Sequence, residues 1–133
     1  MDLFKREGVA VVIEHRGNLA ETVCDFLTSY GYLAIATSTH AEAARCAVEL
    51  HDVTLLAASV PAPDEDRAGI YLADALRRNP RMAVVLMLSD PLEEADDAPD
   101  QSVRIVKPFS REALVGAIMA SENLVHRIAS GQR

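Results

Sequence analysis

The chain has 133 residues and little of what disulfide-bonded, metal-binding or membrane proteins require. Its two cysteines, Cys24 and Cys46, are too few for a disulfide framework and lack the spacing of a metal site. No stretch reaches the run of about 18 apolar residues that a membrane span needs. Residues 1–7 lack the cationic start and the apolar run of a signal peptide. These absences predict a cytoplasmic protein that does not enter membranes.

Positive charge is also in short supply. The sequence has 20 acidic and 13 basic residues, which gives a net charge of −7. Such a balance repels phosphate backbones and anionic lipids, so we expect neither nucleic acid nor membrane as a partner. The acidity is local, because six acids lie in residues 90–100 and three in residues 64–66, leaving 11 acids against 13 bases elsewhere. With half of its residues apolar, the chain is expected to form one domain over 1–133.

Short apolar runs alternate along the chain with helical patterns. The runs expected to form buried strands are 9–13, 32–37, 53–58, 82–88 and 102–106. The stretches expected to form helices are 18–30, 39–50, 69–78 and 110–129. This alternation predicts a parallel sheet covered by helices on both faces. Five strands favour a flavodoxin-like, doubly wound α/β fold with strand order 2-1-3-4-5.

Polar residues predict where several helices begin and end. Asn18, Thr39 and Ser110 are expected to cap the first, second and last helices, and Gly31 to end the first. The inward face of the last helix is expected to carry four residues: Leu114, Ile118, Val125 and Ile128.

In a sheet of this kind, ligands bind outside the carboxyl ends of the strands. Those ends carry Glu14-His15, Ala57, Ser89 and Lys107. The loop after the first strand lacks the glycines of a dinucleotide site, and no phosphate-binding GxxxxGK[ST] loop is present. With no nucleophile–base pair, metal cluster or cofactor loop in view, we do not expect an enzyme. Lys107 is notable because the chain has only two lysines beside 11 arginines.

These residues resemble the receiver domains (CheY-like) of bacterial response regulators, over a core of about residues 8–125. The family pattern is an acidic pair after strand one, an aspartate with a proline four residues later, a Ser/Thr after strand four, and Lys-Pro after strand five. The residues that occupy these positions are Glu14-His15, Ala57 with Pro61, Ser89, and Lys107-Pro108. The resemblance implies a role in signal transduction.

The departures from the family pattern concern its chemistry. Ala57 occupies the position of the phosphoacceptor aspartate, and His15 replaces one of the two acids after strand one. The family binds Mg²⁺ with converging carboxylates, whereas here Glu14 alone remains to balance Lys107. We therefore expect an ion pair, no Mg²⁺ or other cofactor, and no aspartyl phosphorylation: a degenerate pseudo-receiver.

The surface used for signalling is expected to differ as well. Arg104 stands where the family has an aromatic switch residue, and the stretch from Ser89 to Lys107 is short for a receiver. The fourth helix should therefore be shortened or irregular within residues 90–101. We expect this remodelled face to bind a protein partner or a second copy of the chain, with Arg104, Arg111, Glu93 and Glu94 as its charged residues.

Several alternatives stay open. Phosphoryl chemistry could take place at Ser59, with the acids of residues 64–66 reaching in to bind a metal. The pocket at Ser89 and Lys107 could retain an anion site, and His15 could titrate near neutral pH as a sensor. A small-ligand site on the same scaffold is a further alternative.

Overall fold

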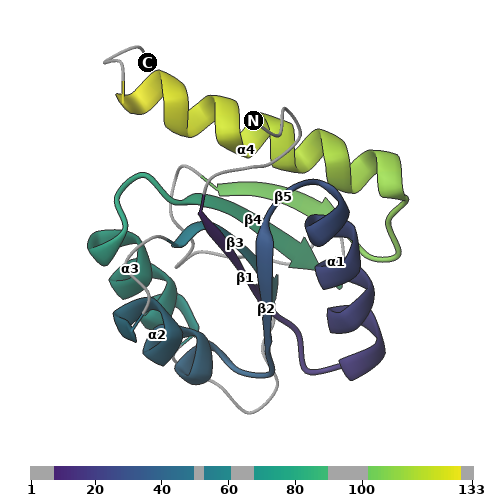
Figure 1. Cartoon of the computed structure of the whole chain (residues 1–133), viewed down its shortest axis with the longest axis horizontal. Helices are drawn as coiled ribbons and strands as arrows, with labels where there is room; N and C mark the ends of the chain where they lie inside the picture. The colour runs from purple at the N-terminus through teal and green to yellow at the C-terminus, as the bar shows by residue number, and fades with distance from the viewer. Residues whose placement is uncertain (1–7, 50–52, 61–67, 90–101, 130–133) are drawn as a thin grey trace.

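A computed structural model describes residues 8–49, 53–60, 68–89 and 102–129. Five parallel strands form one sheet in the order β2-β1-β3-β4-β5 (Figure 1). The strands are β1 (Val9–Ile13), β2 (Leu33–Thr37), β3 (Val53–Val60), β4 (Ala83–Leu88) and β5 (Ser102–Val106). The predicted fold class and strand order are confirmed. The segment expected to hold a shortened fourth helix, 90–101, lies outside the described residues.

Four described helices cover the two faces of the sheet. They are α1 (Gly17–Ser29), α2 (His40–Glu49), α3 (Ala68–Arg78) and α4 (Arg111–Ala129). In Figure 1, α2 and α3 lie together on one side of the strands, with α1 and α4 on the other. No helix within the described part of the chain is long and apolar enough to cross a membrane.

The two faces are filled by separate apolar clusters, because successive side chains of a strand point to opposite faces. Val11 and Ile13 of β1 pack toward α2 and α3, with Leu72 among their neighbours. Ala10 and Val12 belong to the second cluster, toward α1 and α4. Both faces of β1 are therefore buried, as its uninterrupted apolar run predicts.

The end of α1 and the start of α4 are formed as predicted. Gly31 has a φ of 110°, and its N–H donates to the carbonyl of Thr28 while the N–H of Tyr32 donates to that of Leu27. These two bonds are a Schellman motif, which requires the left-handed conformation that glycine adopts readily. The Ser110 hydroxyl oxygen accepts the N–H of Ala113 at 3.0 Å, which makes Ser110 the cap of α4.

Two expectations about the helices are wrong. Asn18 lies inside α1, which begins at Gly17 with Arg16 in the cap position and has no side-chain cap bond. Ile128 is 40 % exposed, whereas Leu114 and Ile118 are buried and Val125 is partly buried. Ile128 is next to the last residue of α4, which ends at Ala129.

Candidate functional site

Four strands deliver a polar side chain to the carboxyl edge of the sheet. Each polar residue follows a core residue of its own strand by two positions and therefore points to the same face, toward α1 and α4. The four pairs are Val12 and Glu14, Ala57 and Ser59, Met87 and Ser89, and Ile105 and Lys107. The alternation that fills the core thus also brings these polar residues to one edge.

Glu14 is the centre of this arrangement, and its side chain is fully buried. Its Oε1 accepts hydrogen bonds from the ammonium of Lys107 and from the hydroxyl of Ser59, the latter at 2.7 Å. Its Oε2 accepts the backbone N–H of Arg16 at 2.8 Å and lies 3.0 Å from Nδ1 of His15. The ion pair expected between Glu14 and Lys107 is present.

The surroundings of Glu14 favour its charged form. Burial alone raises the pKa of this carboxyl, because a charged group loses hydration in the interior. The backbone N–H of Arg16, the ammonium of Lys107 and the hydroxyl of Ser59 together outweigh burial, so the pKa lies below its ordinary value of 4.5. Glu14 is therefore an anion at neutral pH, and Lys107 is its counter-ion.

The structure places Ala57 in the core and Ser59 against Glu14. Ala57 pairs in register with Val12 and Val85, and its side chain lies in the apolar cluster, 2 % exposed. The side chain that meets Glu14 is Ser59, two positions later. The reason is that β3 continues to Val60, two residues beyond the predicted end of the strand.

The sequence contained a clue to this register. Pro63 follows Ser59 by four residues, as Pro61 follows Ala57, so the family spacing fits either residue. The sequence motifs give no indication that His40 belongs to this region. It is buried, and its Nε2 lies 3.3 Å from the carbonyl oxygen of Ser59, so the start of α2 contacts the same segment of β3.

Ser89 and Lys107 lie on an open cavity of about 440 Å³ at this edge. Ser89 is exposed, and its backbone N–H donates to the carbonyl of Val60 at 3.3 Å. Of the predicted pocket residues, His15 and Lys107 each contact Glu14. Ser89 borders the cavity, and Ala57 lies in the core.

No protein-family model matches the sequence, and no curated protein is significantly similar to it. Solved structures do match. A response regulator receiver protein from Sinorhizobium medicae is 21 % identical with a TM-score of 0.74, over 90 % of this chain and 96 % of that one. The signal receiver domain of an HD domain-containing protein from Pseudomonas fluorescens is 14 % identical with a TM-score of 0.77, over 98 % and 97 %. An orphan response regulator of H. pylori is 18 % identical with a TM-score of 0.70, over 89 % and 98 %.

The chain has the receiver-domain fold. At these identities the likeness is one of fold, and the chemistry of the site has to be argued from its own residues. Among the four polar residues that the strands bring to this edge, Glu14 alone carries a carboxylate, where the resemblance implies several.

The described residues do not suit Mg²⁺. This ion prefers several oxygen ligands in octahedral geometry. Both oxygens of Glu14 already accept hydrogen bonds, and the Lys107 ammonium lies against one of them. Over the described ranges, no three His, Cys, Asp or Glu side chains gather closely enough to hold a metal ion.

The residues expected on the signalling surface lie in different parts of the chain's structure. Arg104 is exposed on the edge strand β5, as expected. The guanidinium of Arg111 lies 5.1 Å from the ring centre of Phe26 in α1. Arg111, the first residue of α4, therefore borders the groove between α1 and α4. Glu93 and Glu94 lie outside the described residues.

Proposed function

We propose that this chain is a receiver-like signalling module that acts through protein contacts, without aspartyl phosphorylation. The observation that carries this proposal is the buried Glu14, whose Oε1 is shared by Lys107 and Ser59. A receiver that forms an acyl phosphate needs an aspartate at this edge. Serine is the residue that meets the Glu14–Lys107 pair here.

Charge supports the same proposal. One carboxylate and one ammonium balance each other, so the pair is compensated without a metal ion. Phosphoryl transfer needs cations that offset the charge on the phosphoryl oxygens, and in receivers the resemblance assigns that role to Mg²⁺. With Lys107 already neutralised by Glu14, an incoming phosphoryl group finds little excess positive charge at this pair.

The partner we propose is a protein of a cytoplasmic signalling pathway, or a second copy of the chain. Among the described residues, the proposed contact surface is formed by β5 and α4; Glu93 and Glu94 of the acidic segment lie outside them. Arg104 is exposed at the centre of β5 and supplies a positive charge for contact with a partner. The proposal includes neither DNA nor membrane as a target.

The test is exposure of the purified chain to Mg²⁺ and acetyl phosphate, followed by intact-mass measurement. A receiver domain with an intact aspartate, treated in parallel, shows that the donor is active. We expect no phosphoryl adduct on this chain and a full adduct on the control. A stoichiometric adduct would refute phosphorylation independence. Native mass spectrometry of the same sample then distinguishes monomer from homodimer.

The second candidate function is modification or anion binding at this edge. Its support is the Ser59 hydroxyl, which donates to the Glu14 carboxylate, and the nearby cavity bordered by Ser89 and Lys107. A phosphoryl group on Ser59 would survive conditions that hydrolyse acyl phosphates, and Ser59→Ala would abolish it. Fragmentation mass spectrometry of protein isolated from cells distinguishes this candidate from the first.

A further inference from the structure

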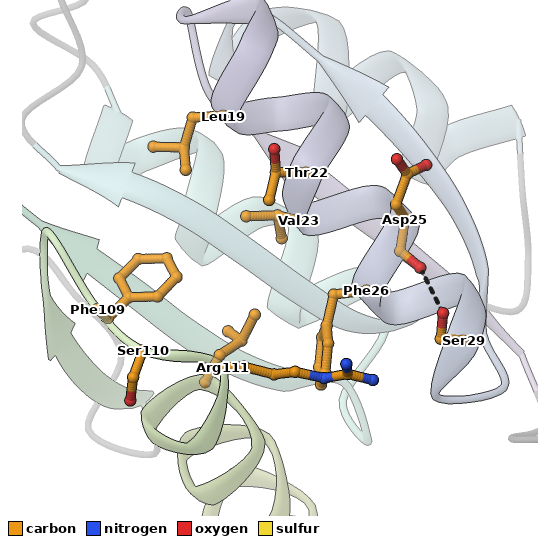
Figure 2. Close-up of a pocket in the computed structure, with 10 residues that line it drawn as sticks. Leu19, Thr22, Val23, Asp25, Phe26, Ser29, Phe109, Ser110 and Arg111 are labelled. Carbon is orange, nitrogen blue, oxygen red and sulfur yellow. Dashed lines mark hydrogen bonds between the residues drawn. The ribbon is translucent and has the colours of Figure 1, made fainter.

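A groove of about 380 Å³ lies between α1 and the start of α4 (Figure 2). Its lining includes five apolar side chains from these two segments: Leu19, Val23, Phe26, Phe109 and Leu114. Phe109 and Leu19 face the groove from opposite sides in the close-up. Its volume falls within the range of about 300–1,000 Å³ that small-molecule pockets occupy.

This groove adjoins the cavity at the carboxyl edge of the sheet. Leu19 and Phe109 line both spaces, so the two meet at these side chains. The neighbouring cavity adds Arg16 and Lys107, so the cleft that the two form has an apolar part and a polar part. Such a combination suits a ligand with an apolar body and a polar head.

The charge of the cleft is opposite to that of the protein. Its described lining residues include Arg16, Lys107 and Arg111 but a single acid, Asp25. Lys107 is balanced by the buried Glu14 underneath it, and the two arginines remain as the exposed cations of the cleft. In a chain whose net charge is −7, this concentration of positive charge favours an anion.

We propose that this cleft binds a small amphipathic anion, with its apolar body between Leu19, Phe26 and Phe109 and its anionic group toward Arg16. The ligand class is an aromatic or acyl carboxylate or sulfonate of drug-like size. Such a ligand buries apolar surface in the groove and keeps its charge at the polar end. The inference does not depend on how the chain signals, because it uses side chains other than Ser59.

The probe for the test is 1-anilinonaphthalene-8-sulfonate, which is fluorescent, aromatic and anionic. N-phenyl-1-naphthylamine has the same body without the sulfonate and is the matched neutral probe. We expect saturable binding of the anionic probe at one site per chain, and binding of the neutral probe that is weaker by roughly fivefold or more. Amide chemical-shift changes should be confined to α1, the start of α4 and the residues around Lys107.

Two threonines of α1 provide a matched pair of variants. Thr22 and Thr28 are both exposed, and each hydroxyl donates to the carbonyl four residues earlier at 2.9 Å. Thr22 lines the groove, whereas Thr28 does not. Thr22→Glu places a negative charge in the groove and should weaken the anionic probe by roughly fivefold or more, whereas Thr28→Glu should leave its affinity unchanged.

Equal affinity for the two probes, equal effects of the two variants, or fluorescence that does not saturate would overturn the proposal. The thermal midpoint of each variant, measured without probe, shows that both fold. Failure of the probe to bind leaves the phosphodonor experiment unaffected, because that experiment detects a phosphoryl adduct at the carboxyl edge. If the anionic probe fails and a protein partner protects the α1 amides, the groove is a protein contact.

Discussion

The hydroxyl of Ser59 donates a hydrogen bond of 2.7 Å to the buried carboxylate of Glu14. This contact follows from the register in which β3 pairs with β1 and β4. It also sets the net charge of the site, because the side chain beside the Glu14–Lys107 pair is uncharged. A receiver that forms an acyl phosphate carries a second negative charge there. Changing that single residue should therefore change the affinity of the edge for metal.

Ser59→Asp is expected to create a Mg²⁺ site. The variant would place two carboxylates beside the one ammonium of Lys107, and the excess negative charge with added oxygen ligands favours a hard divalent cation. Isothermal titration should show saturable Mg²⁺ binding for Ser59→Asp and none for the neutral, similarly shaped Ser59→Asn. Binding by Ser59→Asn would show that the added charge is not the cause.

Ala57→Asp tests the same register from the other side. Ala57 lies in the apolar cluster, so an aspartate there buries a carboxylate without a partner. The free energy of unfolding should fall by about 3 kcal/mol or more, with no gain of Mg²⁺ binding. Urea denaturation measures the loss. A stable Ala57→Asp variant that binds Mg²⁺ would show that residue 57, rather than residue 59, faces the Glu14–Lys107 pair.

Lys107→Met should lower the free energy of unfolding but leave the affinity for a protein partner nearly unchanged. Lys107 is 12 % exposed at its side chain and is the ammonium partner of Glu14, so its removal leaves a buried carboxylate without a counter-ion. We expect a loss of about 3 kcal/mol, at the lower end for broken buried pairs because Ser59 and Arg16 still donate to Glu14.

The double variant Glu14→Gln/Lys107→Met removes both charges and should recover much of that loss in urea denaturation. Additive losses from the two substitutions would contradict a coupled pair. Partner affinity, measured under conditions where each variant is folded, should remain close to that of the parent protein.

The stability of the chain should fall in acid partly through Glu14. Burial raises the pKa of this carboxyl, but the hydrogen bonds from Arg16, Lys107 and Ser59 bring it below 4.5. A group with a lowered pKa in the folded state stabilises the fold above its unfolded pKa, and this contribution is lost as pH falls through the folded pKa. The loss attributable to Glu14 should therefore begin near pH 4.5 and continue below it.

The measurement is urea denaturation across this pH range for the parent protein, Glu14→Gln and Glu21→Gln. Glu21 is exposed on α1 and controls for removal of a carboxylate elsewhere. Glu14→Gln should flatten the dependence of unfolding free energy on pH below pH 4.5, while Glu21→Gln should retain the parent slope. The same slope in all three proteins would remove Glu14 as a source of the acid sensitivity.

The fold was largely predictable because each strand is a nearly uninterrupted apolar run and each helix has an apolar stripe. The strand 102–106 was predicted with the bounds that β5 has. The Glu14–Lys107 pair also followed from sequence, since the carboxyl ends of parallel strands share one edge. These features depend on local patterns that tertiary contacts reinforce.

The sequence-based expectations differ from the structure where two residues fit the same local pattern equally well. Ala57 and Ser59 share a face of β3, and each has a proline four residues later, so only pairing with β1 and β4 decides which reaches Glu14. Asn18 has the chemistry of a cap, but α1 starts one residue earlier, at Gly17. Ile128 continues the apolar stripe of α4 to its last turn but is exposed there.

The two capping expectations can be compared directly by substitution. Ser110→Ala removes the oxygen that accepts the Ala113 N–H and should cost about 1 kcal/mol of unfolding free energy. Asn18→Ala removes an exposed side chain inside α1 and should cost less than about 0.5 kcal/mol. Chemical denaturation of both variants provides the comparison, and a larger cost at Asn18 would contradict the observed start of α1.

Charge reversal at Arg104 tests the proposed contact surface. Arg104 is exposed on β5, an edge strand paired only with β4 in the described sheet, so Arg104→Glu removes a surface charge without disturbing the core. If the partner or the second copy binds over β5 and α4, the variant should lower affinity by roughly tenfold, through loss of attraction and added repulsion. The control is Arg81→Glu, which makes the same charge change at an exposed residue just before β4, at the amino-terminal end of the strands. Titration of each variant with the partner, or sedimentation for a homodimer, measures the difference.

Equal weakening of binding by both variants would indicate a general effect of net charge. The proposed contact surface at β5 would then lose its support.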